Sequence, residues 1–266
     1  DPSYDAYDPM VRLAGGVPIH IPLKASNNFA IDWAELASKI TPRTRAIMVN
    51  SPHNPTGAVW SMADLDAFAE VVTGTNILII SDEVYEHIVF DGAKHASVLL
   101  HPELRKRSFV CGSFGKTYHI TGWKIGSCIA PAYLTAEFRK LHQWVTFSSA
   151  TPLQYALADY LKEPAHYLGL SDFYQKKRDL FASQFAGSAW KVLPSAGSFF
   201  QCLDYSAISN EKDVDLADRL TREIKVASIP VSVFYETDPG DKILRFCFAK
   251  EDEVLLEAAK RLVQLA

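Results

Sequence analysis

The feature that most constrains the fold is an alternation of short apolar segments with segments of helical periodicity in the first half of the chain. Apolar, β-branched runs typical of strands cover residues 18–23, 45–50 and 77–81, and helical patterns cover residues 32–40 and 62–72. This order is typical of βα units that feed a parallel sheet. We therefore predict an α/β fold whose sheet is mostly parallel and flanked by helices.

The second half of the chain shows a different order of elements. Apolar strands at 108–111 and 126–130 bracket a polar segment with glycines, and helical patterns then run from about 134 to 185. After Pro194, strand and helix patterns alternate over shorter distances, which is typical of a smaller α+β unit. We predict strands at 197–203, 229–233 and 243–248, and helices at 214–224 and 251–265. The predicted organisation is a large domain over residues 1–165 and a small C-terminal domain over residues 166–266.

Composition and charge exclude several classes of protein. Apolar residues make up 48% and charged residues 22% of the 266 residues, which is ordinary for a globular protein. The net charge is −4 and the basic residues are dispersed, so nothing favours nucleic-acid binding. No apolar stretch reaches the roughly 20 residues that span a bilayer, and no signal segment is present. The four cysteines form no C-x-x-C pair, so we expect reduced thiols and a cytoplasmic protein that acts on small molecules.

Four polar segments carry the residues that could do chemistry. They are Ser-Pro-His-Asn-Pro-Thr-Gly at 51–57, Ser-Asp-Glu-Val-Tyr at 81–85, Gly-Ser-Phe-Gly-Lys-Thr at 112–117 with Gly-Trp-Lys-Ile-Gly at 122–126, and Leu-Arg-Phe-Cys at 244–247. Each alone has a structural explanation, as a turn, a helix cap, a solvated lysine or a paired arginine. Three of them directly follow apolar strands, and open α/β sheets bind ligands at the carboxyl ends of their strands. We predict that these segments form one site.

In order and in spacing, the four segments resemble the aminotransferases that use pyridoxal phosphate, the class I/II family of fold type one. Longer strings, Asp-Pro-Ser-Tyr-Asp-Ala-Tyr at 1–7 and Gly-Lys-Thr-Tyr-His-Ile-Thr-Gly-Trp-Lys at 115–124, resemble the methionine and kynurenine (glutamine–phenylpyruvate) branches. The resemblance implies ping-pong transfer of an amino group from an L-amino acid, of methionine or aromatic type, to a 2-oxo acid. It also implies a homodimer.

The resemblance assigns a role to each motif residue that would contact the cofactor ring. Lys116 corresponds to the lysine that forms the Schiff base and moves the substrate proton, because an amine can do both. Asp82 corresponds to the carboxylate that faces the pyridine nitrogen and favours its protonated form. Asn54 and Tyr85 correspond to groups that contact the phenolic oxygen, and Tyr4 to the aromatic residue that stacks on the ring.

Further roles concern the phosphate and the substrate. Ser113 and Lys124 correspond to phosphate ligands, although many relatives carry arginine at the position of Lys124. Arg245 corresponds to the residue that binds the substrate α-carboxylate with its planar guanidinium, and Asn54 lies beside the substrate as well. The histidines near these motifs show no metal-ligand spacing, so we predict no metal site.

Family members continue upstream of the segment at 1–7, with an N-terminal arm and a phosphate-binding loop that this sequence does not contain. We therefore expect a longer parent protein. Two other hypotheses stay open at this point. The same residues could catalyse β- or γ-elimination on a sulfur amino acid, as a C–S lyase, because a carbanion at Cα can expel a leaving group. The chain could also be a truncated, catalytically silent relative.

Overall fold

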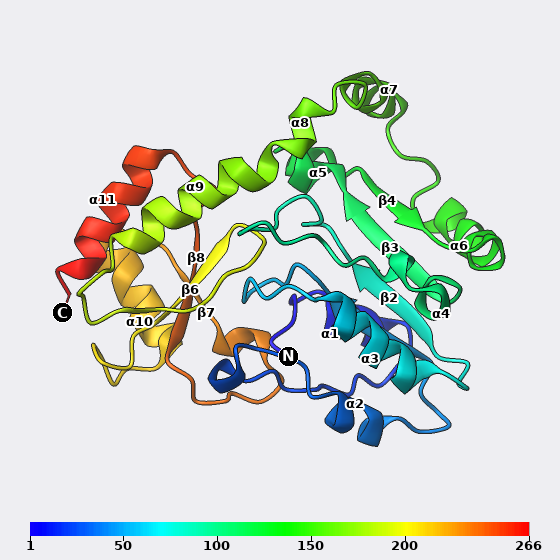
Figure 1. The fold of residues 1–266 in the computed structure, drawn as a ribbon, viewed down its shortest axis with the longest axis horizontal. Helices are drawn as coiled ribbons and strands as arrows, with labels where there is room; N and C mark the ends of the chain where they lie inside the picture. Colours follow the sequence, from blue (N-terminus) through cyan, green and yellow to red (C-terminus); the bar gives the residue numbers. More distant parts are fainter. Residues whose placement is uncertain (266) are drawn as a thin grey trace. The chain divides into compact units, whose positions relative to one another are not determined.

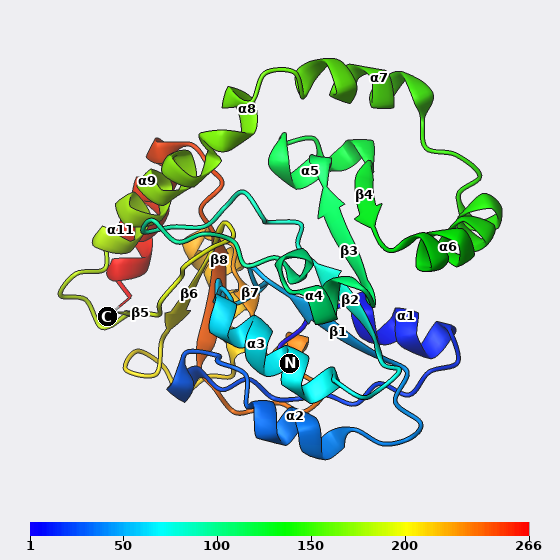
Figure 2. The same ribbon diagram turned by 45° about the vertical axis from the view of Figure 1, so that its right-hand side comes forward.

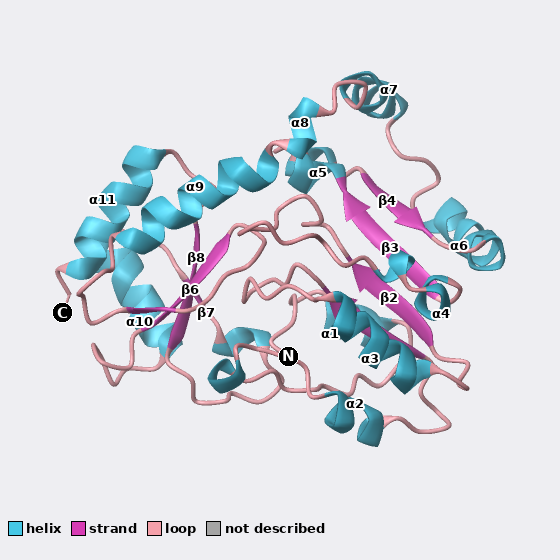
Figure 3. Ribbon diagram, viewed as in Figure 1, coloured by secondary structure: helices cyan, strands magenta, loops and turns pink. Residues whose placement is uncertain are grey.

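The fold consists of two units that each contain a four-stranded sheet (Figure 1 and Figure 3). The computed structural model describes residues 1–265. We call residues 40–52 and 59–172 the central unit. We call residues 1–39, 53–58 and those from Phe173 onward the terminal unit. The first 39 residues thus group with the C-terminal part of the chain. The large domain at 1–165 and the small domain at 166–266 stay predictions.

The sheet of the central unit is mostly parallel, and its strands follow one another in chain order. Its strands are β1 (Ala46–Asn50), β2 (Leu78–Asp82), β3 (Ser108–Ser113) and β4 (Gly126–Ile129). The first three strands are parallel to each other, and β4 is antiparallel to β3. In this register Asp82 lies opposite Asn50 on one side and Cys111 on the other. The carboxyl ends of β1, β2 and β3 therefore lie at the same edge of the sheet.

Helix α3 (Met62–Val72) of the central unit begins at a recognisable cap. It begins after Ser61, which forms a reciprocal capping box with Asp64. Its apolar face, which includes the fully buried Leu65 and Phe68, belongs to the core of this unit. The unit's other helices are the short α4 (Pro102–Arg105) and α5 (Phe114–Thr117), then α6 (Ala132–Val145), α7 (Thr151–Tyr160) and α8 (Ala165–Leu168).

The sheet of the terminal unit is antiparallel throughout, in the order β5-β6-β8-β7. Its strands are β5 (Lys191–Val192), β6 (Phe200–Asp204), β7 (Ile229–Pro230) and β8 (Ile243–Cys247). Its α-helices are α1 (Tyr7–Leu13), α2 (Trp33–Lys39), α9 (Leu170–Ser183), α10 (Asp213–Arg219) and α11 (Asp252–Val263). Helices α9 and α11 lie side by side in Figures 1 and 2, and Lys177 of α9 donates a 2.8 Å hydrogen bond to Asp252 of α11.

The prediction of an α/β fold with a mostly parallel sheet is confirmed, with two local corrections. The strand predicted at 18–23 is wrong, because this extended segment joins no sheet and bonds instead to Asp1, through Ile21 C=O and Leu23 N–H. The strand predicted at 229–233 ends at Pro230, because the amide and hydroxyl of Ser232 both donate to the Asp213 carboxylate. No helix of residues 1–265 combines the length and the apolar character that crossing a membrane requires.

Candidate functional site

The segment after β2 presents Asp82 and Tyr85 at the carboxyl edge of the central sheet. The carbonyl of Asp82 accepts hydrogen bonds from the Asn50 side chain at 2.8 Å and from the Ser51 amide at 3.2 Å. The Asp82 carboxylate accepts the amide N–H of Val84 at 3.2 Å, which closes a turn of the backbone. Tyr85 is buried to 3% exposure. Both of these predicted site residues therefore extend from a backbone that several hydrogen bonds hold in place.

Glu83, between these two residues, anchors the turn. Its buried carboxylate accepts hydrogen bonds from the Ser81 hydroxyl at 2.8 Å and the Val98 amide at 3.1 Å, and it pairs with His95 Nε2 at 2.7 Å. Burial by itself raises the pKa of Glu83, but hydrogen bonds with the side chains of His95, Ser97 and Ser81, together with the electrostatic attraction of His95, more than offset it and leave the pKa below its ordinary value. Glu83 was not among the predicted site residues, because an acidic residue in a loop gives no sign of burial.

Lys116 lies on α5, directly beyond the end of β3 (Figure 2). The hydroxyl of Ser113 caps this helix by accepting the Lys116 amide N–H at 3.3 Å. The Lys116 ammonium nitrogen lies 5.6 Å from the centroid of the Tyr85 ring. Gly115 permits close packing here, since a Cβ at this position would lie 3.0 Å from the Thr121 Cα. The structure thus brings Lys116, Ser113 and Tyr85 together.

Lys124 lies close to this group of residues because it lies just before β4, which pairs with β3. It adopts a left-handed backbone conformation with φ 55° and ends the turn before β4. Two residues later, Gly126 lies directly opposite Ser113 in the β3–β4 ladder. A pocket with about 310 Å³ of empty space lies beside Ser113 and is lined also by His87, Thr117 and Tyr167. Five of the eight predicted site residues therefore lie in one part of the central unit.

Two other predicted residues, Asn54 and Arg245, meet in the terminal unit. Arg245 Nη1 donates a 2.5 Å hydrogen bond to Asn54 Oδ1, although the two residues are 191 positions apart in sequence. Arg245 occupies the middle of β8, opposite Cys202 of β6 and Ile229 of β7. Its guanidinium also lies over two aromatic rings, that of Phe200 at 4.1 Å and that of Phe234 at 5.0 Å. Phe200 was not among the predicted site residues.

A tight turn holds Asn54 in this position. Gly57 ends the turn with φ +75°, and its carbonyl accepts hydrogen bonds from the amides of Ala196 at 2.8 Å and Gly197 at 3.0 Å. Within the turn His53 Nδ1 lies 2.6 Å from the Thr56 hydroxyl. Burial lowers the pKa of His53 to about 3, so this histidine is neutral at physiological pH.

Tyr4, the last predicted site residue, lies near the start of the terminal unit. Its side chain is 45% exposed and its ring makes an edge contact with Tyr7, with 5.7 Å between centroids. The amide of the preceding residue, Ser3, donates to the carbonyl of Phe234 at 2.8 Å. This bond joins the Tyr4 segment to the segment that contacts Arg245, and the stacking role of Tyr4 stays a prediction.

One group of side chains in the described residues, Asp8, His20 and Glu236, has the spacing of metal ligands. Arg12 already forms a salt bridge with Asp8, and His20 pairs with the carboxylates of Asp8 at 3.0 Å and Asp1 at 2.6 Å. These contacts explain the group as a partly exposed network of ion pairs.

The residues of the central unit fit pyridoxal phosphate by their chemistry. The aldehyde requires an amine, which Lys116 could provide, and the pyridine nitrogen requires an anion, which Asp82 could provide. The phenolic oxygen requires a donor, for which the Tyr85 hydroxyl is suited, and the phosphate requires a hydroxyl and a cation such as those of Ser113 and Lys124. In the structure, Lys116 Nζ lies 5.6 Å from the centroid of the Tyr85 ring, and strand β2 ends at Asp82.

Comparison with known proteins identifies the family of the chain. Residues 1–262 match the family described as aminotransferase class I and II. The chain is 50% identical over 266 residues to methionine aminotransferase of Escherichia coli (strain K12), and this alignment covers 100% of this chain and 69% of that protein. It is 35% identical to kynurenine–oxoglutarate transaminase 3 of Rattus norvegicus, over 96% of this chain and 62% of that protein. A solved Escherichia coli structure, described as having a methionine aminotransferase function, superimposes with a TM-score of 0.96 at 49% identity, covering 99% of this chain and 70% of that one.

The chain belongs to the class I and II aminotransferases. It is a pyridoxal-phosphate-dependent enzyme that transfers amino groups between amino acids and oxo acids. The resemblance to the methionine and kynurenine branches is thereby confirmed, and the elimination reaction is not favoured. The roles of individual residues are proposals, which follow.

Proposed function

We propose that the protein transfers the amino group of methionine or an aromatic L-amino acid to a 2-oxo acid by a ping-pong mechanism, with Lys116 as its central residue. The observation that carries this proposal is the grouping of the Lys116 amine, the Tyr85 ring and the Asp82 carboxylate at the carboxyl edge of the central sheet. The 50% identity to a methionine aminotransferase supports the choice of donor.

Lys116 has two tasks in this proposal. Its amine would hold the cofactor covalently, and the same amine would remove and return the proton at the substrate Cα. Its place in α5 favours both tasks, because the cap at Ser113 and the close approach at Gly115 fix the backbone from which the side chain extends. Bound pyridoxal phosphate supplies the electron sink that makes this Cα proton acidic.

Asp82 and Tyr85 hold the ring in its reactive form. The Asp82 carboxylate would keep a proton on the pyridine nitrogen, and the Tyr85 hydroxyl would donate to the phenolic oxygen. Both depend on the backbone turn that Glu83 anchors through Ser81 and His95. Ser113 and Lys124 would bind the phosphate, and Tyr4 would be the aromatic residue that stacks on the ring.

Arg245 and Asn54 bind the α-carboxylate of the substrate. A guanidinium presents two parallel N–H donors to a carboxylate, and the 2.5 Å bond to Asn54 fixes its orientation. This contact sets the direction of the substrate amino group. We further propose that the active form is a homodimer, as the family resemblance implies, and that it is cytoplasmic, as the absence of a C-x-x-C pair favours.

The test is a panel of amino donors assayed against one 2-oxo acid, with Lys116→Ala as the inactive control. We expect methionine and aromatic amino acids to give the highest kcat/KM. Initial velocities measured at varied concentrations of both substrates should follow a ping-pong pattern. Release of ammonia and an oxo acid without an amino acceptor would show a lyase instead. Activity retained by Lys116→Ala would remove Lys116 from the mechanism.

A further inference from the structure

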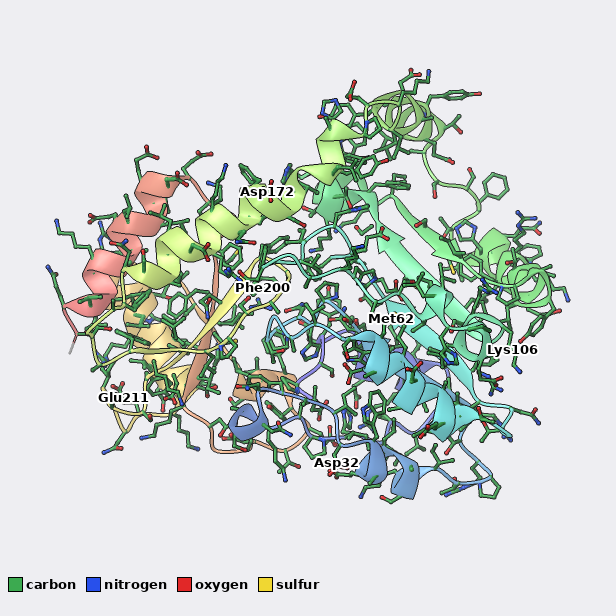
Figure 4. The ribbon with its side chains drawn as sticks, viewed as in Figure 1. Asp32, Met62, Lys106, Asp172, Phe200 and Glu211 are labelled. Carbon is green, nitrogen blue, oxygen red and sulfur yellow. The ribbon has the colours of Figure 1, made fainter. Side chains whose placement is uncertain are left out.

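The guanidinium of Arg245 lies within cation–π distance of two phenyl rings in the terminal unit. Its central carbon is 4.1 Å from the Phe200 ring centroid and 5.0 Å from that of Phe234. Both rings are largely buried, at 7% and 8% exposure, and Figure 4 shows Phe200 on β6. A cation over the face of a desolvated ring is attracted by the ring quadrupole. The two rings therefore act on Arg245 in addition to its bond with Asn54.

The sheet register explains why Phe200 reaches Arg245. Arg245 lies opposite Cys202, and Phe200, two residues before Cys202, lies opposite Cys247. Side chains two positions apart on a strand share a face, so Phe200 and Arg245 project from the same face of the sheet. Phe246 projects from the other face, where it contacts Phe181 and Trp190.

Phe234 belongs to a separate segment, whose position is fixed by hydrogen bonds that do not involve Arg245. It ends the 3-10 turn Ser232–Phe234. The buried Asp213 accepts the Ser232 amide at 2.8 Å and its hydroxyl at 2.7 Å, which anchors the start of the turn. Ser3 donates to the Phe234 carbonyl at 2.8 Å and anchors its end. The second ring is thus held by its own hydrogen bonds and not only by packing on Arg245.

We propose that Phe200 and Phe234 are positioning residues that hold the Arg245 guanidinium in the orientation required to bind the substrate carboxylate. The inference rests on the proposed role of Arg245. Asn54 fixes one edge of the guanidinium through Nη1, while the rings restrict the direction in which its plane faces. A preordered guanidinium loses less side-chain entropy when the carboxylate binds, which raises affinity without touching the reaction step.

The experiment measures binding of 4-(methylthio)butanoate, a carboxylate that has no amino group and cannot react, to the full-length protein loaded with cofactor. Calorimetry gives its Kd for the wild type and for Phe200→Leu, Phe234→Leu, Arg245→Ala and Phe246→Leu. The last variant is the matched control, since it removes a buried ring from the same strand as Arg245 but from the opposite face. The uncharged amide of the same acid is titrated in parallel, and steady-state kinetics separate KM from kcat.

We expect each of Phe200→Leu and Phe234→Leu to raise the Kd of the acid about threefold to tenfold. In these two variants the Kd of the amide should change less than about twofold, and in Phe246→Leu the Kd of the acid should change equally little. Phe200→Leu and Phe234→Leu should retain kcat while their KM rises. A partly fluorinated phenylalanine at position 234 keeps the shape of the ring and weakens its quadrupole, so it should raise the Kd even if the leucine variants fold poorly.

Three results would overturn the inference. An unchanged Kd in both leucine variants, with binding abolished in Arg245→Ala, would leave Arg245 as the carboxylate ligand and remove the rings from its function. An equal loss in Phe246→Leu would mean that only packing of the sheet is affected. An unchanged Kd in Arg245→Ala would contradict the proposed role of Arg245 itself, and with it the role of both rings.

Discussion

Replacing Gly57 by alanine tests how the turn that carries Asn54 is built. Gly57 has φ +75°, a conformation in which a residue with a Cβ is strained by about 1–2 kcal/mol. A Cβ there would also lie 2.5 Å from Ser195 Oγ and 3.1 Å from the Gly197 carbonyl, closer than van der Waals contact allows. Overpacking of this kind costs about 1–3 kcal/mol. Gly57→Ala should therefore lower the free energy of unfolding by about 2–5 kcal/mol.

Gly74 provides the matched control for this variant. It has the same φ of +75°, but nothing lies within 4 Å of the position its Cβ would take. Gly74→Ala should therefore show the backbone strain alone, about 1–2 kcal/mol. The assay is urea unfolding followed by tryptophan fluorescence, for both variants and for Gly57→Ala combined with Ser195→Ala. Removing the Ser195 hydroxyl should recover part of the loss, since it removes the closest contact.

Because Asn54 shares this turn, Gly57→Ala should also weaken carboxylate binding while Gly74→Ala leaves it unchanged. The reasoning would be refuted if the two alanine variants lost the same free energy of unfolding. It would be refuted equally if Ser195→Ala gave no recovery in the double variant.

Three further predictions concern pH, the pyridine nitrogen and the phosphate. The pKa of His53 falls from 6.5 to about 3 on folding, so below about pH 6.5 the unfolded chain binds a proton that the folded chain does not. The free energy of unfolding therefore falls by about 2 kcal/mol between about pH 7 and about pH 5. In urea unfolding at these two pH values, the free energy of unfolding of His53→Gln should fall by about 2 kcal/mol less than that of the wild type. An equal fall in both proteins would contradict the burial of a neutral His53. Asp82→Asn should lower kcat by at least about 100-fold and change the cofactor Kd far less, as stopped-flow and fluorescence titrations can show; a loss confined to Kd would oppose an electronic role. Lys124→Ala should raise the Kd for pyridoxal phosphate about ten- to hundredfold, and Lys124→Arg should restore it; an unaltered Kd in Lys124→Ala would show that the phosphate binds elsewhere.

Elements whose signals are local could be predicted from the sequence. Helix α3 was predicted at 62–72 and spans Met62–Val72, because the pattern and the cap lie within a few residues of each other. The extended segment at 18–23 was mistaken for a strand for the opposite reason. Alternating apolar residues favour an extended backbone, but a strand also needs a partner, and partners are not encoded nearby in the sequence.

The candidate site shows the same division. The motif that contains Lys116 is contiguous, so its residues indicate a cofactor from the sequence alone. The bond between Asn54 and Arg245 spans 191 positions, and the approach of Phe200 to Arg245 depends on the β6–β8 register. Glu83 and Phe200 look like ordinary residues in sequence, and only burial and pairing reveal what they hold in place.

The central claim is that Lys116 carries the cofactor, and reduction with borohydride tests it most directly. Protein loaded with pyridoxal phosphate is reduced, digested and mapped by mass spectrometry, with Lys116→Ala treated in parallel. We predict one cofactor adduct, on the peptide that contains Lys116, and none at this site in the variant. An adduct on another lysine such as Lys124, or the absence of any adduct from protein that has bound the cofactor and transfers amino groups, would contradict the account.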